Sequence, residues 1–327
     1  MSTGTSVDYV FAVDLGGTHI RGGIVDEEGA VRARVKYKTP TTSAEEIVNA
    51  LVAAARECER GLASDPSCRA ISVAVPGSVN AANGSLVNAP NLRCLNGFQL
   101  APALARELGR PVIIENDANA AAVGEMWLGA ARGYGAIVCL TLGTGVGGGI
   151  ILDGKLWRGV DGAAAEIGHM SIEPFSSVRC GCGNFGCLEV YASATAIVRM
   201  TREAQSRFPG SVLSEVVELT SADVYHAGRH GDDLAIDVFG RMGVYLGIGL
   251  ASLVNVLNPE MIVITGGVVG SWDLFERHMH EQVFKRAFPL PASHVRIVRA
   301  ECGDDAGMLG AARLGFESAA SSRVQVS

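Results

Sequence analysis

The feature that most constrains the fold is a unit of strand, glycine-rich loop and strand that occurs twice in the sequence. The two copies comprise residues 9–15, 16–18 and 19–25, and residues 136–142, 143–145 and 147–152. A turn-forming segment follows each copy, at residues 26–29 and 153–154. The sequence therefore predicts two glycine-headed β-hairpins far apart in the chain.

A second repeated element supports a duplication. The apolar residues 70–75 form a predicted strand that ends at Pro76-Gly77, and residues 261–265 form one that ends at Gly266-Gly267. Helical periodicity lies between these landmarks, at residues 44–62, 100–108, 118–131, 192–206 and 235–257. Strands that alternate with helices predict an α/β fold built from two similar halves.

Length and composition suggest two domains. The chain has 327 residues, of which 48% are hydrophobic, so that each of two domains can bury a core. We expect a small N-terminal α/β domain at residues 1–117, completed by a C-terminal helix at 306–318. The large α/β domain is then expected at residues 118–305, with a cysteine loop at 169–187.

Charge and targeting signals limit the partners. The formal charge is −7, and no basic cluster is present, so nucleic acid is not an expected partner. Residues 1–9 lack the features of a signal peptide, and the eight cysteines are expected to be reduced in the cytoplasm. The apolar run at residues 242–257 contains three glycines and is shorter than a membrane span, so we expect a core helix there.

Two nucleotide-binding motifs match only in part. Residues 143–148 fit G-x-G-x-x-G, but a strand rather than a helix follows the glycines. Residues 149–155 fit most of a P-loop, yet Leu156 occupies the position where Ser or Thr should bind magnesium. We interpret both matches as false.

The two glycine-rich loops have another use. Residues without Cβ let backbone N–H groups approach a polyphosphate, so two such hairpins can form a phosphate clamp. Asp14, at the end of the first strand, is a candidate to hold magnesium through water. The alternative is that both loops are ordinary tight turns.

Polar residues that suit a sugar follow the predicted strand at residues 111–114. Glu115, Asn116 and Asp117 lie at its carboxyl end, the edge at which α/β sheets bind ligands. Asp117 is either the N-cap of the following helix or the base that accepts a proton from a sugar hydroxyl. Asn91, in a polar turn, is either a hydroxyl ligand or an ordinary loop residue.

One histidine and three clustered cysteines predict a metal site. His169, Cys180, Cys182 and Cys187 supply the ligand set of a closed tetrahedral zinc site, and the intervening glycines let a short loop surround the ion. Such a site is structural, and it would hold Glu166 and Glu189 in place. Buried inert thiols are the alternative.

Together these motifs resemble the ROK family of sugar kinases and sugar-responsive repressors, and within it the bacterial glucokinases. The resemblance covers nearly the whole chain and rests on Asp14 to Thr18, Pro76-Gly77, Pro90-Asn91, Glu115 to Asp117, Leu142 to Gly145, Glu166 to His169, the cysteine loop and Gly266-Gly267. It implies an actin-like, ribonuclease H-like fold of two domains with a cleft between them. ATP and magnesium would bind in that cleft, and the family would form homodimers or dimers of dimers.

The resemblance also implies a role for each matching residue. Asp117 resembles the catalytic base that lets ATP phosphorylate the 6-hydroxyl of glucose. The sugar ligands would be Asn91, Asn116, Glu166, His169 and Glu189. The phosphate contacts would be Gly16, Gly17, Thr18, Thr144 and Gly145, the nucleoside contacts Gly266 and Gly267, and the zinc ligands His169, Cys180, Cys182 and Cys187.

One position departs from the family pattern, and several alternatives stay open. Ala165 stands where the family more often has glycine, and its methyl group could shift Glu166. Other hexoses or amino sugars (mannose, fructose, allose, glucosamine, N-acetylmannosamine) remain possible substrates, and polyphosphate a possible donor. A repressor would need a DNA-binding segment before the first hairpin, where only thirteen residues precede Asp14. A sugar-binding protein without catalysis is disfavoured by the presence of Asp14 and Asp117.

Overall fold

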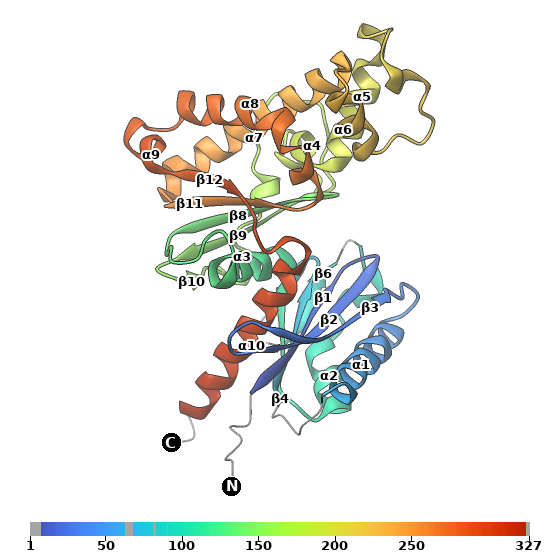
Figure 1. Ribbon diagram of the computed structural model, residues 1–327, viewed down its shortest axis with the longest axis vertical. Coiled ribbons are helices and arrows are strands. Elements are labelled where there is room, and N and C mark those ends of the chain that lie inside the picture. The colour runs from blue at the N-terminus through green and yellow to red at the C-terminus, as the bar shows by residue number, and fades with distance from the viewer. Residues whose placement is uncertain (1–7, 63–67, 81–82, 90, 325–327) are drawn as a thin grey trace. The chain divides into compact units, whose positions relative to one another are not determined.

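The computed structural model describes residues 8–62, 68–80, 83–89 and 91–324 (Figure 1). Pro90 and the N-terminal residues 1–7, on which two of the sequence interpretations depend, lie outside the described residues. The chain divides into two compact units. Unit 1 comprises Met1–Gly133, Gly149–Ala164 and Glu301–Ser327, and unit 2 comprises Tyr134–Gly148 and Ala165–Ala300.

Unit 1 is an α/β unit. Its strands are β1 (Tyr9–Leu15), β2 (His19–Asp26), β3 (Val31–Lys38), β4 (Cys68–Val75), β5 (Ser78–Asn80), β6 (Ser85–Asn88), β7 (Val112–Asn116) and β10 (Lys155–Leu156). Its helices are α1 (Ala44–Arg60), α2 (Leu100–Leu108), α3 (Asp117–Leu128) and α10 (Ala306–Val324), with short 3₁₀ turns η1 (Arg93–Leu95) and η6 (Gly303–Asp305).

Unit 2 carries most of the remaining helices. Its strands are β8 (Ile137–Leu142), the start of β9 (Val146–Leu152), β11 (Met261–Thr265) and β12 (Arg296–Arg299). Its helices are α4 (Glu189–Ala192), α5 (Ala194–Ala204), α6 (Ser221–Arg229), α7 (Asp233–Leu257), α8 (Trp272–Arg286) and α9 (Pro289–His294). Its 3₁₀ turns are η2 (Ile167–His169), η3 (Gln205–Arg207), η4 (Val212–Glu215) and η5 (Gly267–Ser271).

The two five-stranded sheets repeat one strand order. The first sheet runs β3-β2-β1-β4-β7 and the second β10-β9-β8-β11-β12. In the first, β1 pairs antiparallel with β2 and parallel with β4, while β8 and β12 both pair parallel with β11 in the second. Both begin with a glycine-headed hairpin and end in parallel strands, which confirms the predicted duplication.

The central strand of unit 1 is buried on both faces. Phe11, Val13 and Leu15 pack in a core with α1 and α2, whereas Val10 and Ala12 pack against α10 (Figure 1). Successive side chains of a strand point to opposite faces, so a continuous apolar run is what such a strand requires. Parallel pairing places the ends of β1, β4 and β7 at one edge of this sheet.

Helix α10 approaches α3 closely inside unit 1. A Cβ at Gly310 would lie 1.7 Å from the carbonyl oxygen of Ala120, and one at Gly124 would lie 2.2 Å from that of Ala306. Only glycine allows two backbones to pack this tightly. The C-terminal helix therefore packs with α3 in unit 1, whereas the boundary expected between residues 117 and 118 stays a prediction.

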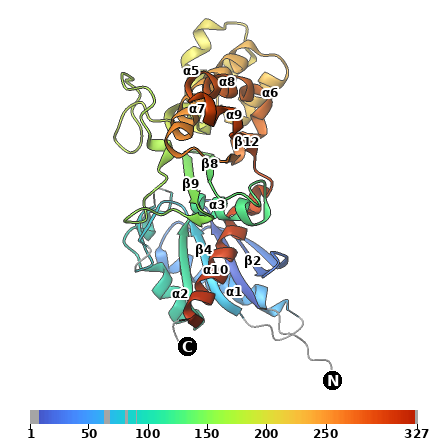
Figure 2. The same ribbon diagram turned by 90° about the vertical axis from the view of Figure 1, so that its left-hand side faces the viewer.

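In unit 2, helices α4 to α9 group on one side of β8, β11 and β12 (Figures 1 and 2). Helix α7 is long and apolar enough to span a membrane by length and composition, but 61% of its most apolar window is buried in the protein. The helix predicted at residues 192–206 is confirmed over α5 and the start of η3, but its first residue, Ala192, belongs to α4. Ser193 ends α4 and is the N-cap of α5, where its side chain accepts a hydrogen bond from the Ala196 N–H at 3.0 Å.

Candidate functional site

The first glycine loop joins β1 to β2 in unit 1. The Gly16 N–H donates to the His19 carbonyl at 2.9 Å, which closes a tight turn. The hydroxyl of the buried Thr39 donates to the Gly16 carbonyl at 2.7 Å, and its N–H donates to the Thr18 carbonyl. Thr39 therefore fixes the loop, although sequence reasoning did not single it out.

Asn91 lies against this loop. An ideal Cβ at Gly17 would lie 3.1 Å from Cβ of Asn91, so the two residues are in direct contact. The structure thus brings a predicted sugar ligand next to a predicted phosphate contact within unit 1. A larger residue than glycine at position 17 would push Asn91 away.

Asp14 is a largely buried carboxylate at the end of β1. Burial raises its pKa above the ordinary value, and the Arg21 guanidinium, 3.5 Å away, opposes that rise. The same guanidinium reaches Asp304 at 3.4 Å. Gly307 in α10 leaves space beside the carboxylate, because its ideal Cβ would lie 3.4 Å from Cγ of Asp14.

Asn116, rather than Asp117, is the N-cap of α3. The side-chain oxygen of Asn116 accepts from the N–H groups of Ala118 and Asn119 at 2.9 and 3.0 Å. Asp117 is the first helical residue, and its Oδ1 accepts from the Ala118 N–H at 2.8 Å. The cap position therefore belongs to the preceding residue.

The amide of Asn116 aligns its neighbour. It donates to the Gly77 carbonyl at 3.0 Å and to Oδ1 of Asp117 at 3.2 Å. Its oxygen and its NH₂ group thus make two hydrogen bonds each within the protein, which is their full capacity. The Pro76-Gly77 turn after β4 therefore positions the end of β7.

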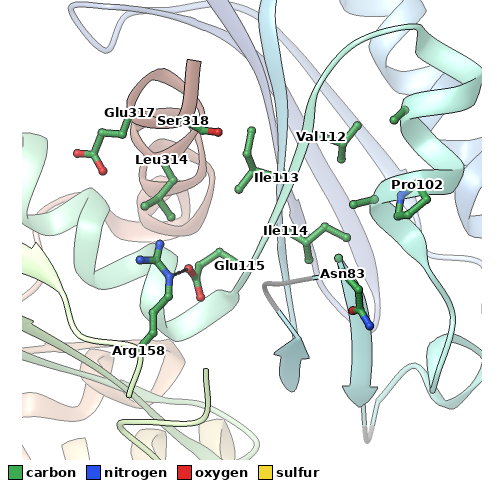
Figure 3. A pocket seen from close by; sticks show the side chains of 13 residues that line it. Asn83, Pro102, Val112, Ile113, Ile114, Glu115, Arg158, Leu314, Glu317 and Ser318 are labelled. Carbon is green, nitrogen blue, oxygen red and sulfur yellow. Dashed lines mark hydrogen bonds and ion pairs between the residues drawn. The ribbon is translucent and has the colours of Figure 1, made fainter. Parts of the chain in front are cut away.

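Glu115 is held by three partners that the sequence did not reveal. Its Oε1 accepts from the Asn116 N–H and from the Asn119 side chain, each at 3.0 Å. Its Oε2 accepts from Nε of Arg158 at 2.7 Å (Figure 3). Arg158 follows β10, more than forty residues along the chain, so no local pattern could have indicated the pair.

The second glycine loop joins β8 to β9. The Gly143 N–H donates to the Gly145 carbonyl at 2.9 Å, and the Thr195 hydroxyl donates to the Thr144 carbonyl at 2.8 Å. The loop therefore has the same two supports as the first loop: an internal backbone bond and a threonine hydroxyl from elsewhere. Thr195 was also missed by sequence reasoning.

Glu189 lies between this loop and the cysteine loop within unit 2. Its Oε2 accepts from the Val146 N–H at 3.0 Å, and its Oε1 lies 3.5 Å from Sγ of Cys180. A Cβ at Gly145 would come within 2.3 Å of Oε2. Two predicted site segments are thus brought together through one carboxylate.

The four predicted zinc ligands converge. The ligand atoms of His169, Cys180, Cys182 and Cys187 all lie within 4.8 Å of one another. The Cys182 and Cys187 sulfurs are 3.8 Å apart, and Nδ1 of His169 is 3.6 Å from Sγ of Cys180. A tetrahedral ion with Zn–S bonds of about 2.3 Å and a Zn–N bond of about 2.0 Å needs separations of about 3.8 Å between two sulfurs and about 3.5 Å between a sulfur and the nitrogen. The donor set and its spacing therefore fit zinc.

The second ring nitrogen of His169 lies near a carboxylate. Its Nε2 is 3.9 Å from a carboxylate oxygen of Glu166. The preceding residue, Ala165, has a φ of 65°, in the left-handed region that favours glycine. This conformation gives a physical reason for glycine being the more frequent residue at this position in the resembling family.

Gly266 and Gly267 follow β11 in unit 2. Gly266 has a φ of 94°, and a Cβ there would lie 2.4 Å from the Leu142 carbonyl oxygen. Nothing lies within 4 Å of the ideal Cβ of Gly267. The first glycine is therefore required by the backbone, and the second leaves open space at the start of η5.

The fold, the two glycine loops and the four clustered metal-ligand candidates define an α/β protein with duplicated halves and a His-Cys₃ cluster. Residues 10–317 match the ROK family, so the chain belongs to that family. It is 35% identical over 309 residues to a glucokinase of Thermotoga maritima, covering 93% of this chain and 96% of that protein.

Other relatives include an enzyme structure and a repressor. A ROK family glucokinase from Streptomyces griseus, crystallised with glucose and AMPPNP, has a TM-score of 0.80 and 34% identity, covering 94% of this chain and 99% of that chain. The chain is also 28% identical over 310 residues to a xylose repressor of Bacillus spizizenii, covering 94% of this chain and 77% of the repressor. These similarities confirm the predicted actin-like fold class.

Proposed function

We propose that the protein is a cytoplasmic ATP-dependent sugar kinase of the glucokinase type, which transfers the γ-phosphoryl group of ATP to the 6-hydroxyl of glucose. The observation that carries the proposal is the placement of Asp117. It lies at the carboxyl edge of the unit 1 sheet, oriented by Asn116. The similarity to glucokinases over nearly the whole chain supports the choice of reaction.

Asp117 acts as the general base. Its carboxylate accepts the proton of the sugar 6-hydroxyl while that oxygen forms a bond to the γ-phosphorus. The bond between the γ-phosphorus and the β,γ-bridging oxygen breaks, and ADP leaves with the electron pair. Because the transition state is loose, the protein contributes mainly orientation and charge stabilisation.

The two glycine loops bind the phosphates. Backbone N–H groups at Gly16, Gly17 and Thr18 in unit 1, and at Thr144 and Gly145 in unit 2, contact the polyphosphate chain. Asp14 would hold magnesium through water, and the ion would supply positive charge to the phosphate oxygens. Gly266 and Gly267 contact the nucleoside, where the open space at Gly267 supports a close approach.

The sugar is recognised through its hydroxyl groups. Asn91 and Asn116 in unit 1, and Glu166, His169 and Glu189 in unit 2, are the proposed ligands. A sugar with the wrong configuration leaves polar groups unpaired once the bound sugar has covered them, at a cost of about 1–3 kcal/mol for each group. Contact with Asn116 would use an amide already committed to Gly77 and Asp117, so this residue also acts by orienting the base.

The His-Cys₃ cluster would hold a structural zinc ion. Its four side chains would supply all the ligands of a closed site, with no position for a reacting water. His169 would bind the ion through Nδ1, so that Nε2 faces the sugar, next to Glu166. Bound zinc supplies rigidity to the loop that carries these two residues.

A coupled assay of ADP release tests the proposal. Purified protein with MgATP should form ADP with glucose, and a panel of mannose, fructose, allose, glucosamine and N-acetylmannosamine, read as kcat/KM, should rank glucose first. Polyphosphate in place of ATP tests the donor, with glucose 6-phosphate rather than ADP as the product measured. A protein that binds glucose but phosphorylates no sugar with either donor would support the alternative of a sugar-responsive repressor, to which the similarity to the xylose repressor points.

A further inference from the structure

We propose that Arg158 is a positioning residue for Asp117, acting through the buried carboxylate of Glu115. The inference rests on the proposed role of Asp117 as the base. It assigns a task to a residue outside every motif of the sequence. All groups involved belong to unit 1.

The ion pair is asymmetric in its burial. The Glu115 side chain is 7% exposed and the Arg158 side chain 38% exposed, with Nε of Arg158 at 2.7 Å from Oε2 of Glu115. A buried carboxylate that loses its only cationic partner keeps an uncompensated charge. Among the described ion pairs, Arg158 is the one cation that contacts Glu115, so the carboxylate depends on this arginine.

The other oxygen of Glu115 organises the start of α3. It accepts from the Asn116 N–H and from the Asn119 side chain. The side-chain oxygen of Asn119 is buried and has no hydrogen-bond partner among the described residues. Among the described residues, the side chain of Asn119 is therefore held by Glu115 alone.

The network ends at the proposed base. Asn116, whose backbone is fixed by Glu115, caps α3 and donates its amide to Oδ1 of Asp117. If Arg158 is removed, the carboxylate of Glu115 is expected to rotate toward solvent, where water replaces the lost hydrogen-bond donor. Both of its bonds to the start of α3 are then lost, and Asp117 moves from its reacting position.

The pair can be reached from solvent through a cavity. A cavity of about 710 Å³ runs along the free edge of β7, between α2 and α10 (Figure 3). Arg158 and Glu115 lie at one end of it, while Val112 and Pro102 lie toward the other (Figure 3). A small cation can therefore enter and replace the guanidinium group.

The first experiment compares Arg158→Ala with Arg158→Lys and with a matched control. Misplacement of the base predicts a kcat about 10- to 100-fold lower in Arg158→Ala, with the KM for glucose within about threefold of the unmodified protein. Lysine restores a cation and should recover most of kcat. Arg32→Ala is the control, because Arg32 also pairs with a fully buried carboxylate, Asp26, at 2.6 Å, and its kcat should not change.

The second experiment asks whether the effect passes through Glu115. Glu115→Gln keeps the shape of the side chain but loses the charge, and it should lower kcat by a similar factor. In the double variant that combines Arg158→Ala with Glu115→Gln, the loss of kcat should be smaller than the product of the two single losses. Both changes break the same chain of hydrogen bonds to Asp117. Millimolar guanidinium chloride should restore activity to Arg158→Ala and leave Arg32→Ala unaffected.

A crystal structure of Arg158→Ala gives a result that does not depend on turnover. We expect the bond between Glu115 and Asn119 to be lost and the Asp117 carboxylate to be displaced. An unmodified protein that phosphorylates no sugar would refute the proposed function, and this structure would still decide the positioning role. If the unmodified protein is active, three results would each overturn the inference. Arg158→Ala keeps its kcat, it loses its kcat only because it unfolds, or its Asp117 carboxylate stays in place.

Discussion

The carboxylate of Glu189 accepts a hydrogen bond from the backbone N–H of Val146 at 3.0 Å. One end of this contact belongs to the helix that follows the cysteine loop, and the other to the first residue of β9, directly after the second glycine loop. The second carboxylate oxygen lies 3.5 Å from the Cys180 sulfur. The side chain of Glu189 thus connects the proposed metal site of unit 2 with its proposed phosphate loop.

Gly145→Ala should disrupt this link. A methyl group at position 145 would lie 2.3 Å from Oε2 of Glu189, so that the carboxylate or the loop must move. We expect kcat/KM for ATP to fall by about tenfold or more and thermal stability to decrease. Gly143→Ala is the control, since nothing lies within 4 Å of its ideal Cβ. Equal effects of the two substitutions would contradict the explanation.

Zinc removal should loosen the cysteine loop. Protein purified without chelator is expected to contain about one zinc ion per chain by elemental analysis. Cys182→Ser should reduce the zinc content, lower the melting temperature and weaken glucose binding, because ligand binding is coupled to the order of this loop. Cys94→Ser, which lies outside the cluster, should change none of these. If the unmodified protein contains far less than one zinc ion per chain, that result would argue against the site.

Asp117→Asn should separate chemistry from binding. The amide keeps the size of the side chain but accepts no proton, so kcat should fall by about 10²–10⁴ while glucose still binds with a similar affinity. Isothermal titration with glucose and the ADP assay measure the two quantities. The exposed Asp153 at the hairpin turn offers a control, because asparagine tolerates its φ of 51°. A variant as active as the parent would remove Asp117 from the mechanism.

The hairpins, the duplicated halves and the metal cluster could be predicted because each depends on short-range patterns. Strand periodicity, glycine at loop positions and the C-x-C-x₄-C spacing are all local. The contacts that fix the site are not local: Thr39 closes the first loop, Thr195 the second, and Arg158 pairs with Glu115. Only the tertiary fold brings these residues together, so a single sequence carried no signal for them.

The N-cap of α3 shows a second limit, because the sequence indicated Asp117 as the candidate whereas the structure has Asn116. Asn and Asp are both favoured as N-caps. Choosing one or the other of two adjacent residues shifts the predicted start of the helix by one residue. The structure resolves the choice because Oδ1 of Asn116 accepts two helix N–H groups. The helices α6, α8 and α9 were not predicted, since none carries a motif. The strand β3 was also not predicted, although it follows the first hairpin directly and its side chains alternate between half-buried and exposed.

Ala165→Gly should stabilise the protein. Alanine at a φ of 65° carries a steric cost that glycine avoids, and the greater entropy of unfolded glycine offsets part of the gain. We expect the free energy of unfolding to rise by about 0.5–1 kcal/mol, measured by urea denaturation. Asn258→Gly, at a φ of 44°, should gain less because asparagine tolerates this region. The same substitution tests whether the methyl group affects Glu166 through the kcat/KM values for glucose and mannose.

Asp14→Asn should raise stability while it lowers activity. Burial raises the pKa of Asp14, so the folded protein disfavours the ionised carboxylate, despite the nearby Arg21. A raised pKa means that this group contributes stability below its unfolded pKa and loses that contribution as the pH rises through its folded pKa. At neutral pH the carboxylate is therefore a net cost, and the uncharged asparagine should melt at a higher temperature than the parent. The difference should shrink as the pH is lowered toward the unfolded pKa of the aspartate, and thermal melts at several pH values measure it.

The ADP assay should show a large loss of activity in the same variant, because the proposed magnesium site loses its charge. A variant that is less stable at neutral pH would show that the bond to Arg21 outweighs the cost of burial.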